Sequence, residues 1–184
     1  MSSLFYAFNG LTLPFYHYKS NNWVEEKKVL VNILPKEDES FLKDDKSIYT
    51  DFYQSTKTPP DYFQTVMSIL TPRFKNFVSN YKLSIQNLNV VSMWWQTAYK
   101  SQRHSVHNHG GVGWSSILYV NFDPEVHSAT TFYTHYADPW TGISSSLSPN
   151  IEEGDLVIFP SYLNHESSPN TSDKKRTIIS FNLL

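Results

Sequence analysis

Residues 107–121 read HNHGGVGWSSILYVN, two histidines and a glycine-rich turn followed by an apolar stretch. From residue 115 to 122 the side chains alternate as they do along a β-strand with two differently packed faces. Residues i and i+2 of an extended segment share a face, so His107 and His109 can direct their imidazoles at one point. The segment therefore predicts a strand that is preceded by two jointly presented histidines.

The rest of the C-terminal half carries similar signals. β-Branched and aromatic residues form short runs, and Gly or Pro residues separate them. Many short strands that follow one helix favour a β-sandwich or barrel with the helix packed outside. The fold class predicted is α+β, mainly β. The expected strands are residues 90–99, 115–122, 130–136, 156–159 and 176–183.

The N-terminal half predicts support for that core. Short strands are expected at residues 4–6, 13–16 and 29–31, and a charged surface loop at 36–57. Apolar residues recur every three or four positions between 60 and 81, which predicts an amphipathic helix, either kinked or divided at Pro72. We expect one domain over residues 1–184, with support from 1–88 and a metal-binding core from 89–184.

Composition excludes several function classes. The 15 Lys and Arg residues against 17 Asp and Glu give a net charge of −2, so nucleic acid is not the expected partner. No apolar run approaches 18 residues and the N-terminus lacks signal-peptide features, so we expect a cytoplasmic protein without a membrane partner. With no cysteine, histidine and carboxylate side chains must hold any metal ion.

The histidines predict such a metal site. His107 and His109 share a face, and His165 follows another predicted strand, whereas His104 is out of phase with the pair. Neutral imidazoles without thiolates suit Fe(II), Zn(II), Ni(II) or Cu(II), and the spacing does not choose among them. The remaining histidines are expected to be structural: His17, His127 and His135.

These residues also carry a family resemblance. The ordered set is His107-Asn108-His109, the strand 116–121, the segment 153–160, then His165 and Arg176. It resembles the double-stranded β-helix of the Fe(II)/2-oxoglutarate-dependent dioxygenases, and is most similar to the prolyl-hydroxylase-like branch and to oxygenases carried by phages. The resemblance covers residues 90–184, about half the chain.

The resemblance implies a jelly-roll, cupin-like fold and an iron-dependent hydroxylase. Fe(II) is expected on His107, His109 and His165, with 2-oxoglutarate and O₂ as co-substrates and succinate and CO₂ as products. Arg176 lies 11 residues after His165, where the family places the basic residue that pairs with the far carboxylate of 2-oxoglutarate; a guanidinium suits that role. Tyr119 is expected either to donate its hydroxyl to the same carboxylate or to be a buried core tyrosine.

Some points stay open at this level. The primary substrate is open among a protein side chain, a small molecule and a modified nucleobase, although a nucleic-acid partner is not expected. The protein is a monomer or a homodimer, and a phage origin would place it in the host cytoplasm. His109 stands where the family usually has Asp or Glu, so either three histidines bind the metal or Asp138 or Asp123 supplies the carboxylate, with His109 outside the ligand set.

Two alternative functions follow from the same residues. Cupin-type metal-dependent dioxygenases or isomerases share the barrel and the His-x-His pair, and Gly154, Pro160 and His165 echo their second motif. The glutamate of their first motif is missing after His109, and Arg176 favours the 2-oxoglutarate enzymes. A non-catalytic jelly-roll binding protein would suit the tryptophans, namely Trp94, Trp95, Trp114 and Trp140.

Overall fold

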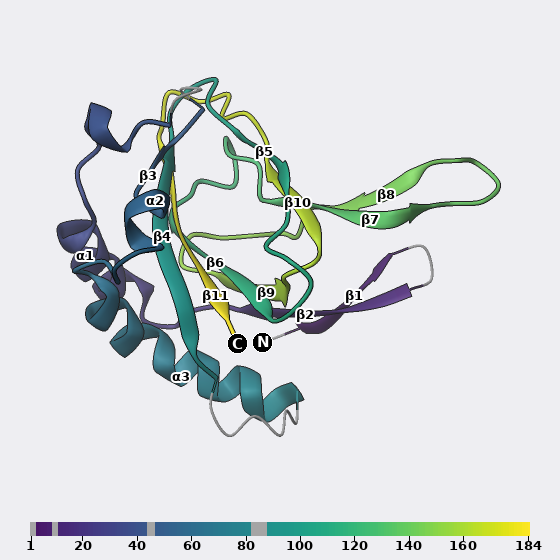
Figure 1. Cartoon of the computed structure of the whole chain (residues 1–184), viewed down its shortest axis with the longest axis horizontal. Coiled ribbons are helices and arrows are strands. Elements are labelled where there is room, and N and C mark those ends of the chain that lie inside the picture. Colours follow the sequence, from purple (N-terminus) through teal and green to yellow (C-terminus); the bar gives the residue numbers. More distant parts are fainter. Residues whose placement is uncertain (1–2, 9–10, 44–46, 82–87) are drawn as a thin grey trace.

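The computed structural model describes residues 3–8, 11–43, 47–81 and 88–184. Two antiparallel sheets face each other in a jelly roll, the double-stranded β-helix expected from the sequence (Figure 1). The larger sheet has the order β1-β2-β9-β6-β11-β4-β3 and the smaller one β5-β10-β7-β8. The larger sheet contains β1 (Ser3–Phe8), β2 (Leu11–Tyr18), β3 (Tyr49–Thr50), β4 (Val90–Ala98), β6 (Trp114–Asn121), β9 (Leu156–Pro160) and β11 (Arg176–Leu183). The smaller sheet contains β5 (His104–His107), β7 (Thr131–Ala137), β8 (Ser144–Leu147) and β10 (Asn164–Ser167).

The C-terminal strands confirm the alternation read from the sequence. β11 lies between β4 and β6, with Ile178 opposite Gln96 on one side and Tyr119 on the other. Successive side chains of a strand point to opposite faces of the sheet. One face of these strands therefore looks into the jelly roll, and the other looks outward toward the helices.

Two hydrophobic clusters fill the two sides of the larger sheet. Between the sheets, Phe15, Phe132 and Phe159 are fully buried and their rings contact one another. On the outer side, the helix α3 (Phe63–Tyr81) packs against the sheet, as Figure 1 shows. Burial of such aromatic surface is the main favourable term in folding.

The helix α3 bears out the predicted amphipathic segment. Its buried face contains Val66, Leu70, Phe74 and Phe77, spaced by three and four residues. The helix continues through Pro72, which lies on the exposed side. The alternative of two consecutive helices is therefore excluded.

The N-terminal half differs from the sequence-based expectation at two places. Residues 29–31 belong to the helix α1 (Trp23–Ile33) and not to a strand, because Leu30 alone is buried there while Val29 and Val31 face outward. An alternation over only three residues fits a strand and an amphipathic helix equally well, because such a helix buries every third or fourth position. The predicted strands at 4–6 and 13–16 are confirmed within β1 and β2.

The expected surface loop at 36–57 also contains ordered elements. They are a short 3-10 helix η1 (Glu39–Phe41), β3 and the helix α2 (Phe52–Ser55), while residues 44–46 lie outside the described part. Asp51 is buried, and its carboxylate accepts the backbone N–H of Trp95 and the hydroxyl of Tyr62. These two hydrogen bonds of Asp51 hold the segment against β4. The number of charged residues in the segment does not predict such an attachment. Across the described residues, no helix has the length and apolar character needed to span a membrane.

Candidate active site

Strand pairing brings two of the predicted histidines together. His107 on β5 and His165 on β10 are direct partners in the antiparallel register. Side chains of directly opposite residues lie on the same face within contact distance. His109 follows the end of β5, where its backbone N–H donates to the carbonyl of Ser161 at 2.9 Å. That bond ties the residue after the strand to the loop between β9 and β10.

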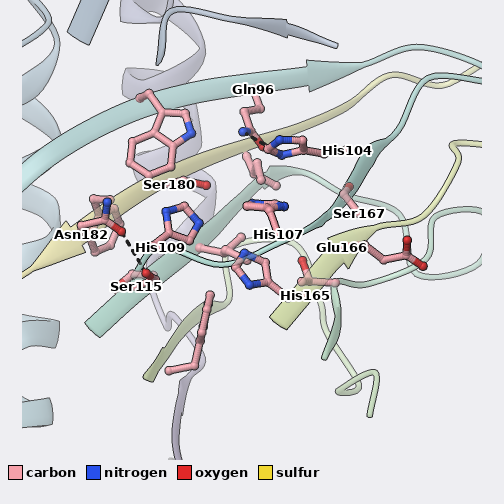
Figure 2. Close-up of a pocket in the computed structure, with 17 residues that line it drawn as sticks. Gln96, His104, His107, His109, Ser115, His165, Glu166, Ser167, Ser180 and Asn182 are labelled. Carbon is pink, nitrogen blue, oxygen red and sulfur yellow. Dashed lines mark hydrogen bonds between the residues drawn. The ribbon is translucent and has the colours of Figure 1, made fainter. Parts of the chain in front are cut away.

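The three imidazoles converge inside the jelly roll. One nitrogen from each of His107, His109 and His165 lies within 4.8 Å of the others. The ring centroids of His107 and His165 are 4.4 Å apart, and those of His109 and His165 are 5.2 Å apart. Figure 2 shows the three rings facing a common point between the sheets. This spacing lets one ion be shared by three nitrogens.

Backbone carbonyls set the tautomers of two of these rings. The Nδ1 atom of His107 lies 2.7 Å from the carbonyl oxygen of Ser105, and that of His165 lies 2.9 Å from the carbonyl of Leu163. A carbonyl oxygen only accepts, so each Nδ1 must carry the proton and donate. The Nε2 lone pairs are then left to bind a metal, as is usual for metal-ligating histidines.

Burial keeps the cluster uncharged. Desolvation lowers the pKa of His109 to about 4 and lowers that of His107. The pKa of His165, which is buried between the sheets, falls well below the ordinary value, first through desolvation and then through the neighbouring His107. Neutral imidazole is the form that coordinates metal ions. The site is therefore prepared for a cation at neutral pH.

The pocket around the imidazoles extends toward a polar end. Its lining includes the hydroxyl groups of Thr130 and Ser167. The hydroxyl of Tyr119 donates to Oγ1 of Thr130 at 2.9 Å, and the guanidinium of Arg176 bonds Oγ of Ser167. Arg176 and Tyr119 thus stand behind the lining, each one hydrogen bond from the pocket.

Arg176 is a buried cation without an anionic partner. Only 4% of its surface is exposed, and its donors reach the carbonyls of Ser128 and Ser168 and the hydroxyl of Ser167. No carboxylate among the described residues pairs with it. Burial lowers the pKa of this guanidinium, which shows the cost of holding the charge there. An organic acid in the pocket would supply the missing charge.

The structure does not bring the alternative carboxylates to the cluster. Asp123 pairs with Lys174 at 2.6 Å, and Asp138 accepts the backbone N–H groups of Trp140 and Thr141 in an exposed turn. Glu166 lines the pocket, but its carboxylate accepts the hydroxyl of Tyr133 and points away from the three rings (Figure 2). Within the described part of the chain, the cluster that could hold a metal consists of histidines alone.

The other histidines have separate roles. His17 bonds the buried Asp155 at 2.8 Å and joins β2 to β9, and His127 lies between the backbone N–H of Asp123 and the carbonyl of Lys174. Both are buried and structural, as expected. His135 is exposed on β7 and its ring contacts only Tyr162 among the described residues.

Sequence reasoning missed part of the pocket wall. The sequence places His104 out of phase with the other two histidines, yet the ring centroids of His104 and His107 are 4.0 Å apart. The reason is that the register between β5 and β10 shifts between His104 and His107. Trp94 and Gln96 also line the pocket, and Trp94 stacks on His109 at 5.4 Å. The alternation of β4 placed these two residues on one face, but the sequence does not show that this face looks at the histidines.

Comparisons with known proteins agree with this architecture. A family model described as "Putative 2OG-Fe(II) oxygenase" matches residues 92–182, from β4 to β11. In fold, the chain is similar to the non-heme α-ketoglutarate-dependent carbocyclase SnoK of nogalamycin biosynthesis, with a TM-score of 0.66 and 11% identity over 93% of this chain and 79% of that one. No curated protein sequence matches the chain.

Two further solved structures share the fold. A viral collagen prolyl hydroxylase from Paramecium bursaria Chlorella virus-1, in complex with 2-oxoglutarate, aligns with a TM-score of 0.60 and 13% identity over 92% of this chain and 94% of that one. HygX from Streptomyces hygroscopicus, with nickel and 2-oxoglutarate bound, aligns with a TM-score of 0.60 and 11% identity over 93% and 82%. Residues 92–182, which contain the three converging histidines and Arg176, belong to the 2OG-Fe(II) oxygenase family.

Proposed function

We propose that this protein is an Fe(II)- and 2-oxoglutarate-dependent oxygenase that hydroxylates a small molecule or a protein side chain and releases succinate and CO₂. The observation that carries the proposal is one pocket with two complementary ends. Three neutral imidazoles converge at one end, and the unpaired guanidinium of Arg176 stands behind the other. A divalent cation and a dicarboxylic acid are the ligands that such a pocket fits.

The donor set fits iron. His107, His109 and His165 would hold the metal through ring nitrogens, and the co-substrate and O₂ would bind the metal on the side that these rings leave open. When bound, Fe(II) supplies the activation of O₂ that couples decarboxylation of 2-oxoglutarate to insertion of one oxygen atom into a C–H bond. A third imidazole in place of a carboxylate leaves the site one unit more positive, which strengthens its attraction for a dianionic acid.

The chain's own residues orient the acid. Arg176 would exchange one of its neutral acceptors, the hydroxyl of Ser167 or the carbonyl of Ser168, for the far carboxylate of 2-oxoglutarate. The hydroxyl of Tyr119 bonds Thr130, which lines the same pocket. Burial raises the pKa of Tyr119, so the hydroxyl keeps its proton and can donate. The phenol and the guanidinium would thus fix the acid at a constant distance from the metal.

The same observations weigh against the other functions. A cupin that binds only metal has no use for a buried arginine without a counter-ion, whose burial costs free energy. A surface for carbohydrate would need exposed aromatic rings, but Trp94 and Trp95 are buried and only Trp140 is largely exposed among the described tryptophans. The net charge of −2 supports a substrate other than nucleic acid.

The test is succinate formation by the purified, iron-loaded protein with 2-oxoglutarate and O₂. We expect slow succinate release even without a substrate, and loss of both iron binding and turnover in His165→Ala. His135→Ala is the matched control because this histidine is exposed on β7, away from the cluster. Iron content that is equal in the two variants, or an absence of succinate from the iron-loaded wild type, would refute the proposal.

A further inference from the structure

A second chamber adjoins the histidine cluster on the side away from Thr130. It has a volume of about 180 Å³ and shares His104, His107 and His109, together with Trp94 and Gln96 of β4, with the first pocket. Its other walls come from α2, from β4 and from the segment before β3. Neither Arg176 nor Ser167 reaches it. The chamber is therefore distinct from the region that the co-substrate would occupy, yet it opens onto the same imidazoles.

The size of the chamber limits what can enter. A protein cavity of about 150 Å³ holds one benzene ring. Aromatic side chains form part of the wall, because Phe52, Tyr53 and Trp94 all line it, and Phe52 meets Trp94 edge-to-face at 5.1 Å. Such walls favour a flat or branched apolar group over an extended polar one. A single ring or a short branched chain fits this space.

The charge of the lining favours an anion. Lys43 is the one formally charged residue among the described residues that line the chamber, and no Asp or Glu joins it there. Its ammonium group has no carboxylate partner within the described ranges. The backbone of Lys43 is fixed because its N–H donates to the carbonyl of Ile48 at 3.0 Å and Leu42 bridges to Tyr49. The Lys43 side chain therefore starts from a fixed point on the chamber wall.

An uncharged hydrogen-bond donor on the lining also favours a ligand with acceptor oxygens. Trp94 is 2% exposed, and its indole Nε1–H finds no acceptor among the described residues. Gln96 and Asn108 lie on the same lining, but their amide groups already bond His104 and Asn164, so the indole of Trp94 is the donor that needs an acceptor. Buried donors without acceptors are rare and costly, so a ligand rich in acceptor oxygens would relieve the cost.

We propose that this chamber binds the primary substrate, and that the substrate is a small carboxylic acid with an aromatic or branched apolar stem. The carboxylate meets Lys43, and the stem lies against Phe52 and Trp94 with a carbon directed at the imidazole cluster. This assignment rests on the proposed oxygenase function, because the cluster then presents the oxidising centre beside the stem. It adds the class of substrate, which the family does not specify.

The experiment measures binding and not turnover. Wild type loaded with Ni(II) and 2-oxoglutarate is titrated calorimetrically with phenylacetate and with 4-methylpentanoate, and then with the matching amides. We expect each acid to bind about fivefold to tenfold more tightly than its amide. In Lys43→Met the acids should weaken to the level of the amides, whereas Lys43→Arg should keep the preference. A partly exposed ion pair is worth about 1 kcal/mol, which corresponds to this ratio.

Controls separate the possible outcomes. Lys75→Met removes an exposed lysine of α3, far from the chamber lining, and should bind the acids as wild type does. N-acetyl-glycyl-phenylalanine presents the same carboxylate on a peptide, and tighter binding of this peptide than of either acid would overturn the small-acid assignment. Equal binding of acids and amides by wild type would also overturn it, while leaving the oxygenase proposal intact. Failure to bind 2-oxoglutarate in the first step would instead refute the oxygenase function on which it rests.

Discussion

At the scale of single residues, the three imidazoles differ in what holds them. His107 and His165 each donate Nδ1–H to a backbone carbonyl two residues earlier, so their orientation is set by the strands themselves. His109 lies beyond the strand, and its ring stacks on Trp94. No backbone carbonyl fixes the tautomer of His109 among the described residues, and the family usually has Asp or Glu there. We therefore expect this position to accept a different type of ligand.

Substitution of His109 tests its place in the metal site. His109→Asp should retain iron, since it restores the carboxylate that the family usually has there, whereas His109→Leu should lower iron affinity by at least about tenfold to a hundredfold through loss of one bond. Metal content after dialysis against a weak chelator measures both. Full retention of iron by His109→Leu would place that side chain outside the ligand set.

The lowered pKa values of the cluster predict how stability of the metal-free protein depends on pH. His109 titrates at about pH 4 in the folded chain and near 6.5 when unfolded, so between these values the unfolded state binds more protons. The free energy of unfolding should therefore fall as the pH drops from about 6.5 to about 4, by up to about 1.4 kcal/mol per pH unit for each such group. His109→Gln should flatten this slope in urea titrations, and His135→Gln should not.

At the scale of elements, the site depends on two short strands and one long one. β5 and β10 have four residues each, and their pairing alone brings His107 opposite His165. β11 is held on both sides, by β4 and by β6, and so carries Arg176 on a rigid support. Of the proposed metal ligands, His107 and His165 thus sit on the smaller sheet and His109 lies just beyond it, while the proposed acid-binding residue Arg176 is on the larger sheet.

The sequence predicts these elements unevenly, for physical reasons. Long, regular patterns such as α3 and β11 give reliable periodicity, and both were predicted correctly. The sequence predicts a strand at residues 29–31, because three residues are too few to distinguish the period of a strand from that of a helix. The convergence of His107 with His165 follows from the family resemblance. The place of His104 depends on a register shift between β5 and β10, and the place of Gln96 depends on which face of β4 looks at the histidines; no local pattern records either.

Arg176 on β11 gives the element-scale prediction. Arg176→Met should weaken 2-oxoglutarate binding to the metal-loaded protein by about thirtyfold or more, since loss of a buried charge-assisted pair costs about 2–5 kcal/mol. Metal affinity should stay unchanged, because none of its hydrogen bonds reaches a histidine. Anaerobic titration followed by the metal-to-ligand absorption band measures the loss. Arg103→Met is the control, because Arg103 is exposed outside the pocket; equal weakening in both variants would contradict the role.

At the scale of the whole molecule, the metal would bridge parts of the chain that are far apart in sequence. The strands β6, β7, β8 and β9 lie between His107 and His165 in the chain, and the Asp155–His17 pair ties the start of β9 to the N-terminal β2. The unfolded chain does not hold these ligands together, so binding free energy is added to folding free energy. Closure of the two sheets and occupancy of the site are therefore linked.

Thermal unfolding with and without metal tests this linkage. At a metal concentration about 100 times Kd, binding to the folded state alone adds about 2.7 kcal/mol, which for a domain of this size raises Tm by roughly 5–10 °C. EDTA should abolish the increase in wild type, and His165→Ala should show none, because His165 lies at the centre of the cluster. The exposed His135→Ala should keep the full shift. A Tm that does not respond to divalent metal, in protein whose metal content is verified, would mean that the ion binds equally well to the unfolded chain and that the converging histidines do not form its site.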